Sequence, residues 1–128
     1  MTKNKVITAL SAVTETTVSN TFYVGGAKRL AVLCRRADDD TGASAFTIKA
    51  SMDAEDTVTP TMTALNLWID NVVNANTQNL TRVNGKTITN ANGDVFLFLD
   101  PKCIVNWIQI TVAETNNGTH SAWIIAEY

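Results

Sequence analysis

The side chains that could carry acid–base or nucleophilic chemistry near neutral pH are few in this chain. Its one histidine, His120, is next to Ser121. Neighbouring side chains of a β-strand point to opposite faces, so these two cannot directly form a nucleophile–base pair. Zinc needs several histidine or cysteine ligands at suitable spacing, and Cys34, Cys103 and His120 do not provide it. The sequence therefore predicts no metal site and no catalytic role for these residues.

The acidic residues gather in two short runs. Residues 38–40 are consecutive aspartates, but the alternating ligands, central glycine and final glutamate of an EF-hand loop are missing. Residues 53–56 contain Asp53, Glu55 and Asp56 without an accompanying aromatic platform for a glycosidase pair. We interpret both runs as solvated turns. Because Gly25-Gly26 also lacks the Lys-Ser/Thr of a phosphate-binding loop, we predict no cofactor and no enzymatic activity.

Length and charge set further limits. The 128 residues have the length of one domain, 1–128, and can bury about two-thirds of their unfolded surface. The net charge of −2 and the pI near 5.2 give no indication of nucleic-acid binding. No window approaches the ~18 apolar residues of a membrane span, and the first residues do not resemble a secretory signal. We therefore expect no membrane association, synthesis in a cytoplasm, and reduced thiols at Cys34 and Cys103.

Composition and alternation indicate an all-β fold. The 19 threonines and 13 asparagines make up a quarter of the chain, and these residue types favour strands and turns respectively. Residues 104–112 and 120–128 are strand-like, and Asn116-Asn117-Gly118-Thr119 predicts that they fold on each other as a hairpin. About eight strands with turns every 8–12 residues predict a single-domain, jelly-roll-like β-sandwich.

Two further strands alternate apolar and polar residues. They cover residues 28–36 and 46–53, and we expect them to pair across the acidic loop at 37–42. Residues 95–99 are instead apolar at every position. Such a run is either a central strand covered on both sides or a strand with one face on another subunit, with Phe96 and Phe98 as the contact residues.

Two segments depart from the strand pattern. Apolar residues at positions 65, 68, 69, 72 and 73 have the spacing of a helix face, so we predict a short helix near residues 64–74. Within it, Trp68 is either a core side chain or a sugar-stacking platform. Residues 1–20 show no clean period, and we expect either an extended N-terminal arm or an edge strand. An arm would be either a mobile tail or a clamp on a neighbouring subunit.

The basic residues cluster at the two ends of the strand at residues 28–36. The cluster consists of Lys28, Arg29, Arg35 and Arg36. Arg35 and Arg36 point to opposite faces of a strand, so at most one of them shares a face with Arg29. The cluster either forms weak salt bridges with the acidic loop or contacts an acidic partner.

Several segments together resemble small structural proteins of tailed bacteriophages, and most closely the jelly-roll capsid decoration, or cement, proteins. These segments are residues 25–29, residues 46–53 with their ending Ser51-Met52-Asp53, residues 74–83 and residues 115–123. The resemblance covers most of the chain. It implies a protein of the capsid exterior that bridges neighbouring major capsid protein subunits, and a dimer or trimer with closed symmetry.

The resemblance also suggests where contacts lie. We expect Phe96, Phe98 or Tyr128 at the subunit contact, and the N-terminal arm with the basic cluster at the capsid. The alternative is a carbohydrate-binding or receptor-binding module of a phage fibre, with Trp68, Trp107 or Tyr23 as a stacking platform. An enzyme is a third hypothesis, and no acid–base set in the sequence favours it.

Overall fold

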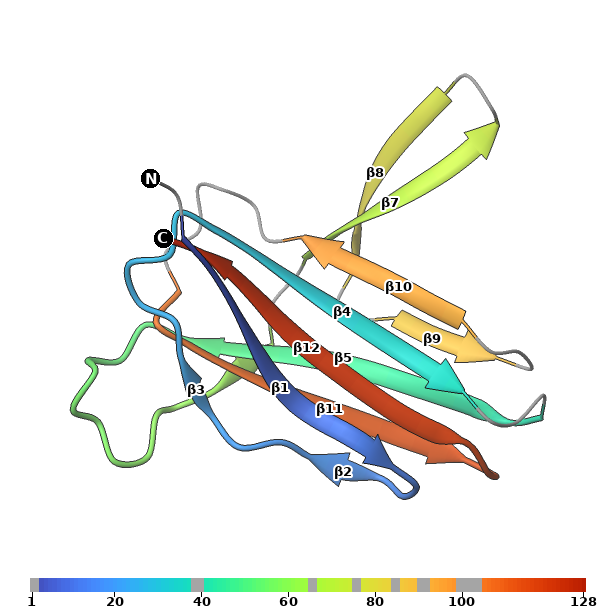
Figure 1. The fold of residues 1–128 in the computed structure, drawn as a ribbon, viewed down its shortest axis with the longest axis horizontal. Helices are drawn as coiled ribbons and strands as arrows, with labels where there is room; N and C mark the ends of the chain where they lie inside the picture. The colour runs from blue at the N-terminus through green and yellow to red at the C-terminus, as the bar shows by residue number, and fades with distance from the viewer. Residues whose placement is uncertain are drawn as a thin grey trace.

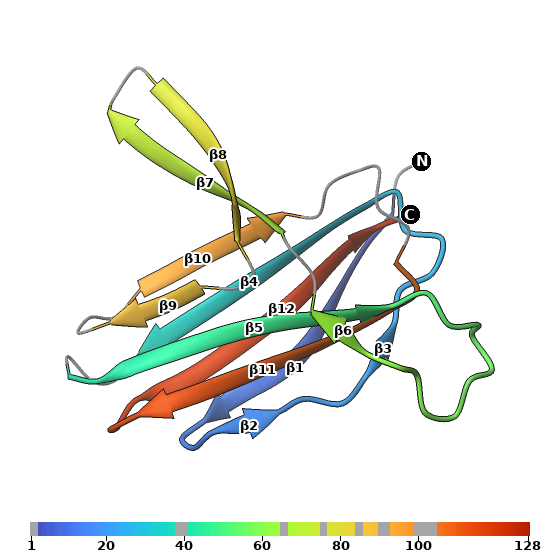
Figure 2. The same cartoon turned by 180° about the vertical axis from the view of Figure 1, so that it is seen from behind.

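The protein is an all-β sandwich in the computed structural model shown in Figures 1 and 2. The structure describes residues 3–37, 41–64, 67–74, 77–83, 86–89, 93–98 and 105–128, with backbone only in the ranges from 67 to 98. Within these ranges there are twelve strands and no helix. They are β1 (Asn4–Val13), β2 (Thr17–Val18), β3 (Phe22–Tyr23), β4 (Arg29–Ala37), β5 (Ala43–Ser51), β6 (Thr63–Ala64), β7 (Leu67–Asn74), β8 (Thr77–Val83), β9 (Lys86–Thr89), β10 (Gly93–Phe98), β11 (Trp107–Thr115) and β12 (Thr119–Glu127).

The strands form two antiparallel sheets, which we call the β12 sheet and the β11 sheet. The β12 sheet has the order β1-β12-β4-β10-β7-β8. The β11 sheet has the order β2-β11-β5-β6, with β3 also paired to β11 and β9 also paired to β5. When β6, β7 and β8 are left aside, two four-stranded sheets remain, with the strand orders β1-β12-β4-β10 and β2/β3-β11-β5-β9. The chain passes back and forth between these two sheets. This is the connectivity of a jelly roll, so the predicted fold class is confirmed.

Both predicted hairpins are wrong in their pairing. β11 and β12 follow each other in the chain but lie in different sheets, and so do β4 and β5. β12 pairs with β1 and β4, whereas β11 pairs with β5. The turn residues do reverse the chain, with positive φ at Gly42, Asn116 and Gly118. However, each reversal leads from one sheet to the other. The two strands that it joins therefore pack against each other through their buried faces.

The predicted helix near residues 64–74 is also wrong. Residues 63–64 form β6, and residues 67–74 form β7, which pairs with β8 and β10. The β7–β8 hairpin extends the β12 sheet and projects beyond the body of the sandwich in both views (Figures 1 and 2). A short apolar run can fit both periods, and its β-branched valines and isoleucine favour the strand.

Residues 4–13 form the edge strand β1 rather than a detached arm. β1 pairs with β12, and β2 pairs with β11, so the two strands within residues 1–20 belong to opposite sheets. At the start of β1, Lys3 N donates to Tyr128 O at 3.3 Å and Tyr128 N donates to Lys3 O at 2.8 Å. The two ends of the chain therefore lie side by side (Figure 1).

The core fills the space between the sheets. Its largest fully buried apolar side chains include Ile48 and Ile110 from the β11 sheet and Val32 and Ile124 from the β12 sheet. These residues alternate with more exposed ones along each strand, as the sequence predicts. Cys34 lies in the same layer, and burial raises the pKa of its thiol to about 12. Cys34 is a free cysteine, and Cys103 lies outside the described residues.

Candidate functional site

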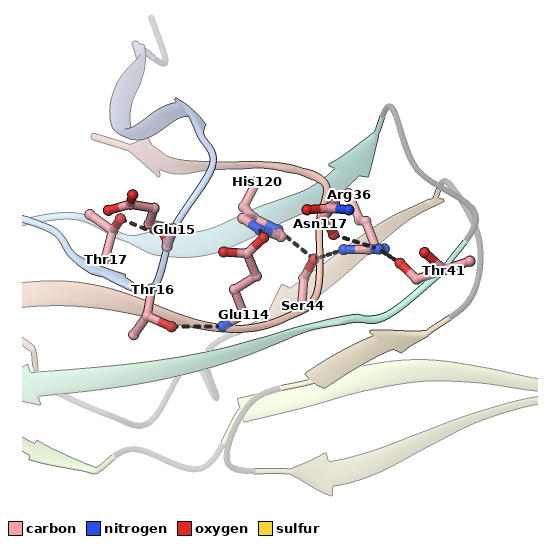
Figure 3. A network of polar contacts seen from close by, with 9 residues as sticks. All are labelled: Glu15, Thr16, Thr17, Arg36, Thr41, Ser44, Glu114, Asn117 and His120. Atoms are coloured by element: carbon pink, nitrogen blue, oxygen red, sulfur yellow. Dashed lines mark hydrogen bonds and ion pairs between the residues drawn. The ribbon is translucent and has the colours of Figure 1, made fainter.

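A group of polar side chains lies inside one end of the sandwich (Figure 3). We call Arg36, Ser44, Glu114 and His120 the buried polar cluster. Arg36 and His120 belong to the β12 sheet, whereas Ser44 and Glu114 belong to the β11 sheet. Arg36, Ser44 and His120 have 0% of their surface exposed. The cluster therefore joins the two sheets through the core.

Ser44 is the centre of this cluster. Its Oγ accepts a hydrogen bond from Arg36 Nη1 at 3.0 Å and lies 2.5 Å from His120 Nδ1. A hydroxyl that accepts from Arg36 can still form a hydrogen bond with the ring nitrogen of His120. The other ring nitrogen, Nε2, lies 3.6 Å from Glu114 Oε1.

Arg36 also fixes the two connections at this end. Its Nη2 donates to the carbonyls of Thr41 and Asn117, the latter at 2.9 Å. Gly118 makes room for the guanidinium, because a Cβ there would lie 2.5 Å from Arg36 Nη1. The sequence-based assignment of Arg36 to a surface contact is therefore wrong. Arg36 has the same parity as Leu30, which faces the core.

A serine, a histidine and a carboxylate in contact resemble the parts of a nucleophilic active site. Such a site must present its nucleophile to a substrate. Ser44 and His120 have no exposed surface, and Ser44 Oγ already accepts a hydrogen bond from Arg36. The geometry therefore favours a structural role for the cluster, in which it fastens the two sheets to each other.

The part of the chain that the structure describes holds no group of at least three His, Cys, Asp or Glu residues that could bind a metal ion. It also holds no helix long and apolar enough to cross a membrane.

The outer face of the β12 sheet carries apolar side chains that are partly exposed. We call it the β12 face and define it by Val6, Ala31, Leu33, Trp123 and Ile125. Across neighbouring strands Trp123 is registered with Leu33, and Ile125 with both Val6 and Ala31. Val6 is 62% exposed, and the other members are half-buried. This row of aliphatic and aromatic groups crosses three adjacent strands.

Basic groups border the β12 face. The Arg35 guanidinium lies over the Trp123 ring, 5.1 Å from its centroid, in the geometry of a cation–π contact. Arg29 is exposed and donates to Glu127 Oε2 through both Nε, at 3.0 Å, and Nη2. Lys28 is exposed just before β4. Three of the four predicted basic residues therefore lie at the surface, and two of them flank or cover this face.

The middle of the outer face of the β11 sheet is polar by contrast, and the exposed Val18 lies at its edge in register with Thr111. We call it the β11 face and define it by Thr47, Lys49, Gln109 and Thr111. Thr47 is registered opposite Thr111, and Lys49 opposite Gln109. Gln109 Nε2 donates to Ser19 O at 3.2 Å. Hydroxyl, amide and ammonium groups keep their hydrogen bonds with water or with the chain, so this face is well solvated.

Tyr23 and Trp107 form an aromatic pair at one end of the β11 sheet. Their ring centroids are 5.2 Å apart with an interplanar angle of 68°. Trp107 Nε1 donates to Asp53 O at 3.1 Å and to Ala54 O at 3.3 Å, which ties the ring to the loop after β5. Both rings are half-buried, so they are partly available for stacking.

The predicted subunit-contact residues lie in different places. Phe96 and Phe98 belong to β10, a strand with neighbours on both sides, and are registered opposite Leu33 and Ala31. Their side chains, like that of Trp68, lie outside what the structure describes. Tyr128 is half-buried against the core at the end of β12. Since β12, which ends at Glu127, has a neighbour on each side, the edge of the sheet next to Tyr128 is formed by β1 and not by β12.

The comparisons with known proteins agree with this architecture. The sequence matches no protein-family model and no curated protein. Among solved structures, the crystal structure of the SPBc2 prophage-derived protein YomS is similar, with a TM-score of 0.66 and 16% sequence identity. The match covers 100% of this chain and 96% of that chain. At this identity the likeness shows that the two chains share a fold.

Proposed function

We propose that this protein is a structural component of a bacteriophage virion, a decoration protein on the outside of the capsid. It binds the major capsid protein through the β12 face and bridges neighbouring capsid subunits. It is made in the host cytoplasm, acts without catalysis and cofactor, and contacts neither nucleic acid nor membrane. The fold shared with a prophage-derived protein supports a phage origin.

The β12 face is the observation that carries this proposal. Trp and Arg are the residue types most enriched at protein–protein contacts, and here Arg35 covers Trp123 at the centre of an apolar row. Removing half-exposed apolar side chains from water lowers the free energy of the complex with a partner. The nearby exposed Lys28 supplies positive charge for an acidic rim on the partner, whereas Arg29 is already paired with Glu127.

Binding to capsids tests the proposal directly. Heads assembled from the major capsid protein encoded in the same phage genome are mixed with the chain and sedimented, and bound copies are located by cryo-electron microscopy. We expect saturable binding that Leu33→Glu abolishes, because the added carboxylate would be buried in the contact. Thr47→Glu, at a half-buried outward position of the β11 face, is the matched control and should leave binding intact. Saturable binding that only Thr47→Glu removes would assign the contact to the other face, and no binding at all would refute the proposal.

A second candidate function rests on the Tyr23–Trp107 pair. Partly exposed aromatic rings next to a polar loop can stack on a sugar ring. In this second candidate function the protein is a carbohydrate-binding module, and Trp107 is the ring on which the sugar stacks. A glycan array separates the two functions, since this candidate requires binding that Trp107→Ala removes while the chain remains folded. Glycan binding retained by Trp107→Ala would exclude this platform.

A further inference from the structure

The β12 sheet has a free edge at β1. β1 is the terminal strand in the sheet order and pairs only with β12 among the described strands. Lys3 and Tyr128 exchange both backbone hydrogen bonds. Hydrogen-bonded pairs alternate along an antiparallel ladder, so Lys5 and Ile7 also direct their backbone groups toward β12. The backbone N–H and C=O groups of the residues between and after them, Asn4, Val6 and Thr8, therefore point away from the sheet.

An apolar side chain stands in the middle of this edge. Val6 is 62% exposed and borders the β12 face through its register with Ile125. Open edges in soluble proteins are ordinarily protected by charges or irregularities. Here Lys3 and Lys5 provide charge, and the register shifts after Thr8 and Leu10 end the regular ladder. The stretch 4–8, which contains Lys5, keeps a regular register with β12.

We propose that two copies of this chain pair through β1, in antiparallel orientation about a two-fold axis at Val6. Val6 then forms a hydrogen-bonded pair with Val6 of the second copy, and Asn4 pairs with Thr8 of the second copy. All outward backbone groups of the regular stretch 4–8 are satisfied. An isologous contact of this kind closes on itself and gives a dimer.

Charge and the register shift after Thr8 favour this register over its neighbours. A two-fold axis at Lys5 would place two ammonium groups directly opposite each other, which is destabilising. An axis at Ile7 would bring Asn4 opposite Leu10, where the register of β1 with β12 has already shifted. With the axis at Val6, Lys5 lies opposite Ile7 and Lys3 lies opposite Ala9. A second copy that pairs about Val6 therefore brings no two lysines directly opposite each other.

The dimer deepens the proposed function. Only the role of the dimer in capsid binding rests on that proposed function, and the pairing itself does not. An axis perpendicular to an antiparallel strand pair keeps the outer faces of both sheets on the same side. The two β12 faces would then form one continuous surface toward the capsid. Two linked contacts hold more tightly than either contact alone.

Proline at Val6 tests the pairing in the absence of capsids. The Val6 N–H is not used by β12, so Val6→Pro removes an edge donor from each copy while leaving the β1–β12 ladder in place. We expect dimerisation about 30-fold weaker by analytical ultracentrifugation, because both symmetry-related hydrogen bonds are lost. Val58→Ala, which trims a 97% exposed valine in the loop after β5, is the control and should leave the dimer unchanged.

Amide exchange in the unmodified chain provides a measurement that needs no variant. Raising the protein concentration should protect the amides of Val6 and Thr8 from exchange, while those of Lys5 and Ile7 stay equally protected at all concentrations. A monomer at all concentrations, a trimer, a Val6→Pro variant that is folded and dimerises normally, or a dimer in which Val6 exchanges freely would each overturn the inference. Because no capsid is present, such a result leaves the capsid-binding proposal to its own test.

Discussion

The two outer faces of the sandwich follow the same alternating pattern and carry different chemistry. On the β12 face, Leu33 is registered opposite Trp123. At the corresponding position of the β11 face, Thr47 is registered opposite Thr111. All of these side chains are half-buried and point away from the same core. The difference between the faces therefore comes from side-chain type and not from their depth in the fold.

This difference separates what the fold needs from what a partner needs. A threonine pair on a pleated surface stabilises a strand and keeps its hydrogen bonds with water. A leucine–tryptophan pair in the same position leaves apolar area in contact with water, which a covering partner would remove. The polar groups of the β11 face thus need no covering partner, whereas the β12 face leaves apolar area partly exposed.

The largest expected effect concerns Arg36, which lies between the faces and belongs to neither. Arg36→Met should lower the free energy of unfolding by about 3 kcal/mol. It removes the guanidinium that donates hydrogen bonds to Ser44 Oγ and to the carbonyls of Thr41 and Asn117. Urea unfolding measures the change. Capsid affinity of the folded variant should not change. If stability were kept and binding lost, Arg36 would belong to the contact surface after all.

The next effect contrasts one tryptophan on each sheet. Trp123→Ala should weaken capsid binding by about 2 kcal/mol, roughly 30-fold, because a central aromatic residue is removed from the contact. Trp107→Ala should leave capsid affinity unchanged. Titration of sedimented capsids with each variant gives both affinities. Equal losses in the two variants would remove the distinction between the faces.

Trp107 should matter instead for stability. Trp107→Phe keeps an aromatic ring but loses the indole N–H that bonds Asp53 O and Ala54 O. We expect a loss of about 1 kcal/mol in the free energy of unfolding, measured in urea. Trp123→Phe serves as the control on the other face, since it keeps a ring beneath Arg35. A larger capsid-binding loss for Trp107→Phe than for Trp123→Phe would reverse the assignment of the faces.

The smallest effect is expected for charge. Arg35→Gln removes a cation–π contact worth about 0.5–1 kcal/mol at an exposed site. Capsid affinity should fall a few-fold, and its dependence on salt should become weaker. Lys49→Gln removes an equally positive, exposed residue from the β11 face and is the matched control. An unchanged salt dependence in Arg35→Gln, or an equal change in Lys49→Gln, would contradict a contact through the β12 face.

Alternation along each strand was predictable, whereas the partner of each strand was not. The parity that places Val32 in the core also places Arg36 there, so its burial could have been inferred from the same pattern. The turn at Gly118 signals a reversal but does not reveal whether the chain stays in its sheet. Both reversals that were expected to be hairpins cross to the opposite sheet, where the strands bury facing surfaces.

The candidate sites were less predictable because they are assembled from distant residues. Ser44 and His120 are 76 positions apart, and no local pattern relates them. Trp123 meets Arg35 only because β12 pairs with β4. The helix expected at Trp68 failed for a related reason: its apolar spacing fitted a helix, but pairing with β8 and β10 makes the segment a strand.

The position of β12 between β1 and β4 has a consequence for synthesis. Of the described strands, β1 comes first along the chain, and its only partner among them is the last, β12. Until residues 119–127 have left the ribosome, β1 lacks its partner among the described strands and this sheet cannot close around β12. A chain that stops before residue 119 lacks the strand that lies between β1 and β4, so these two strands are left without the neighbour that joins them.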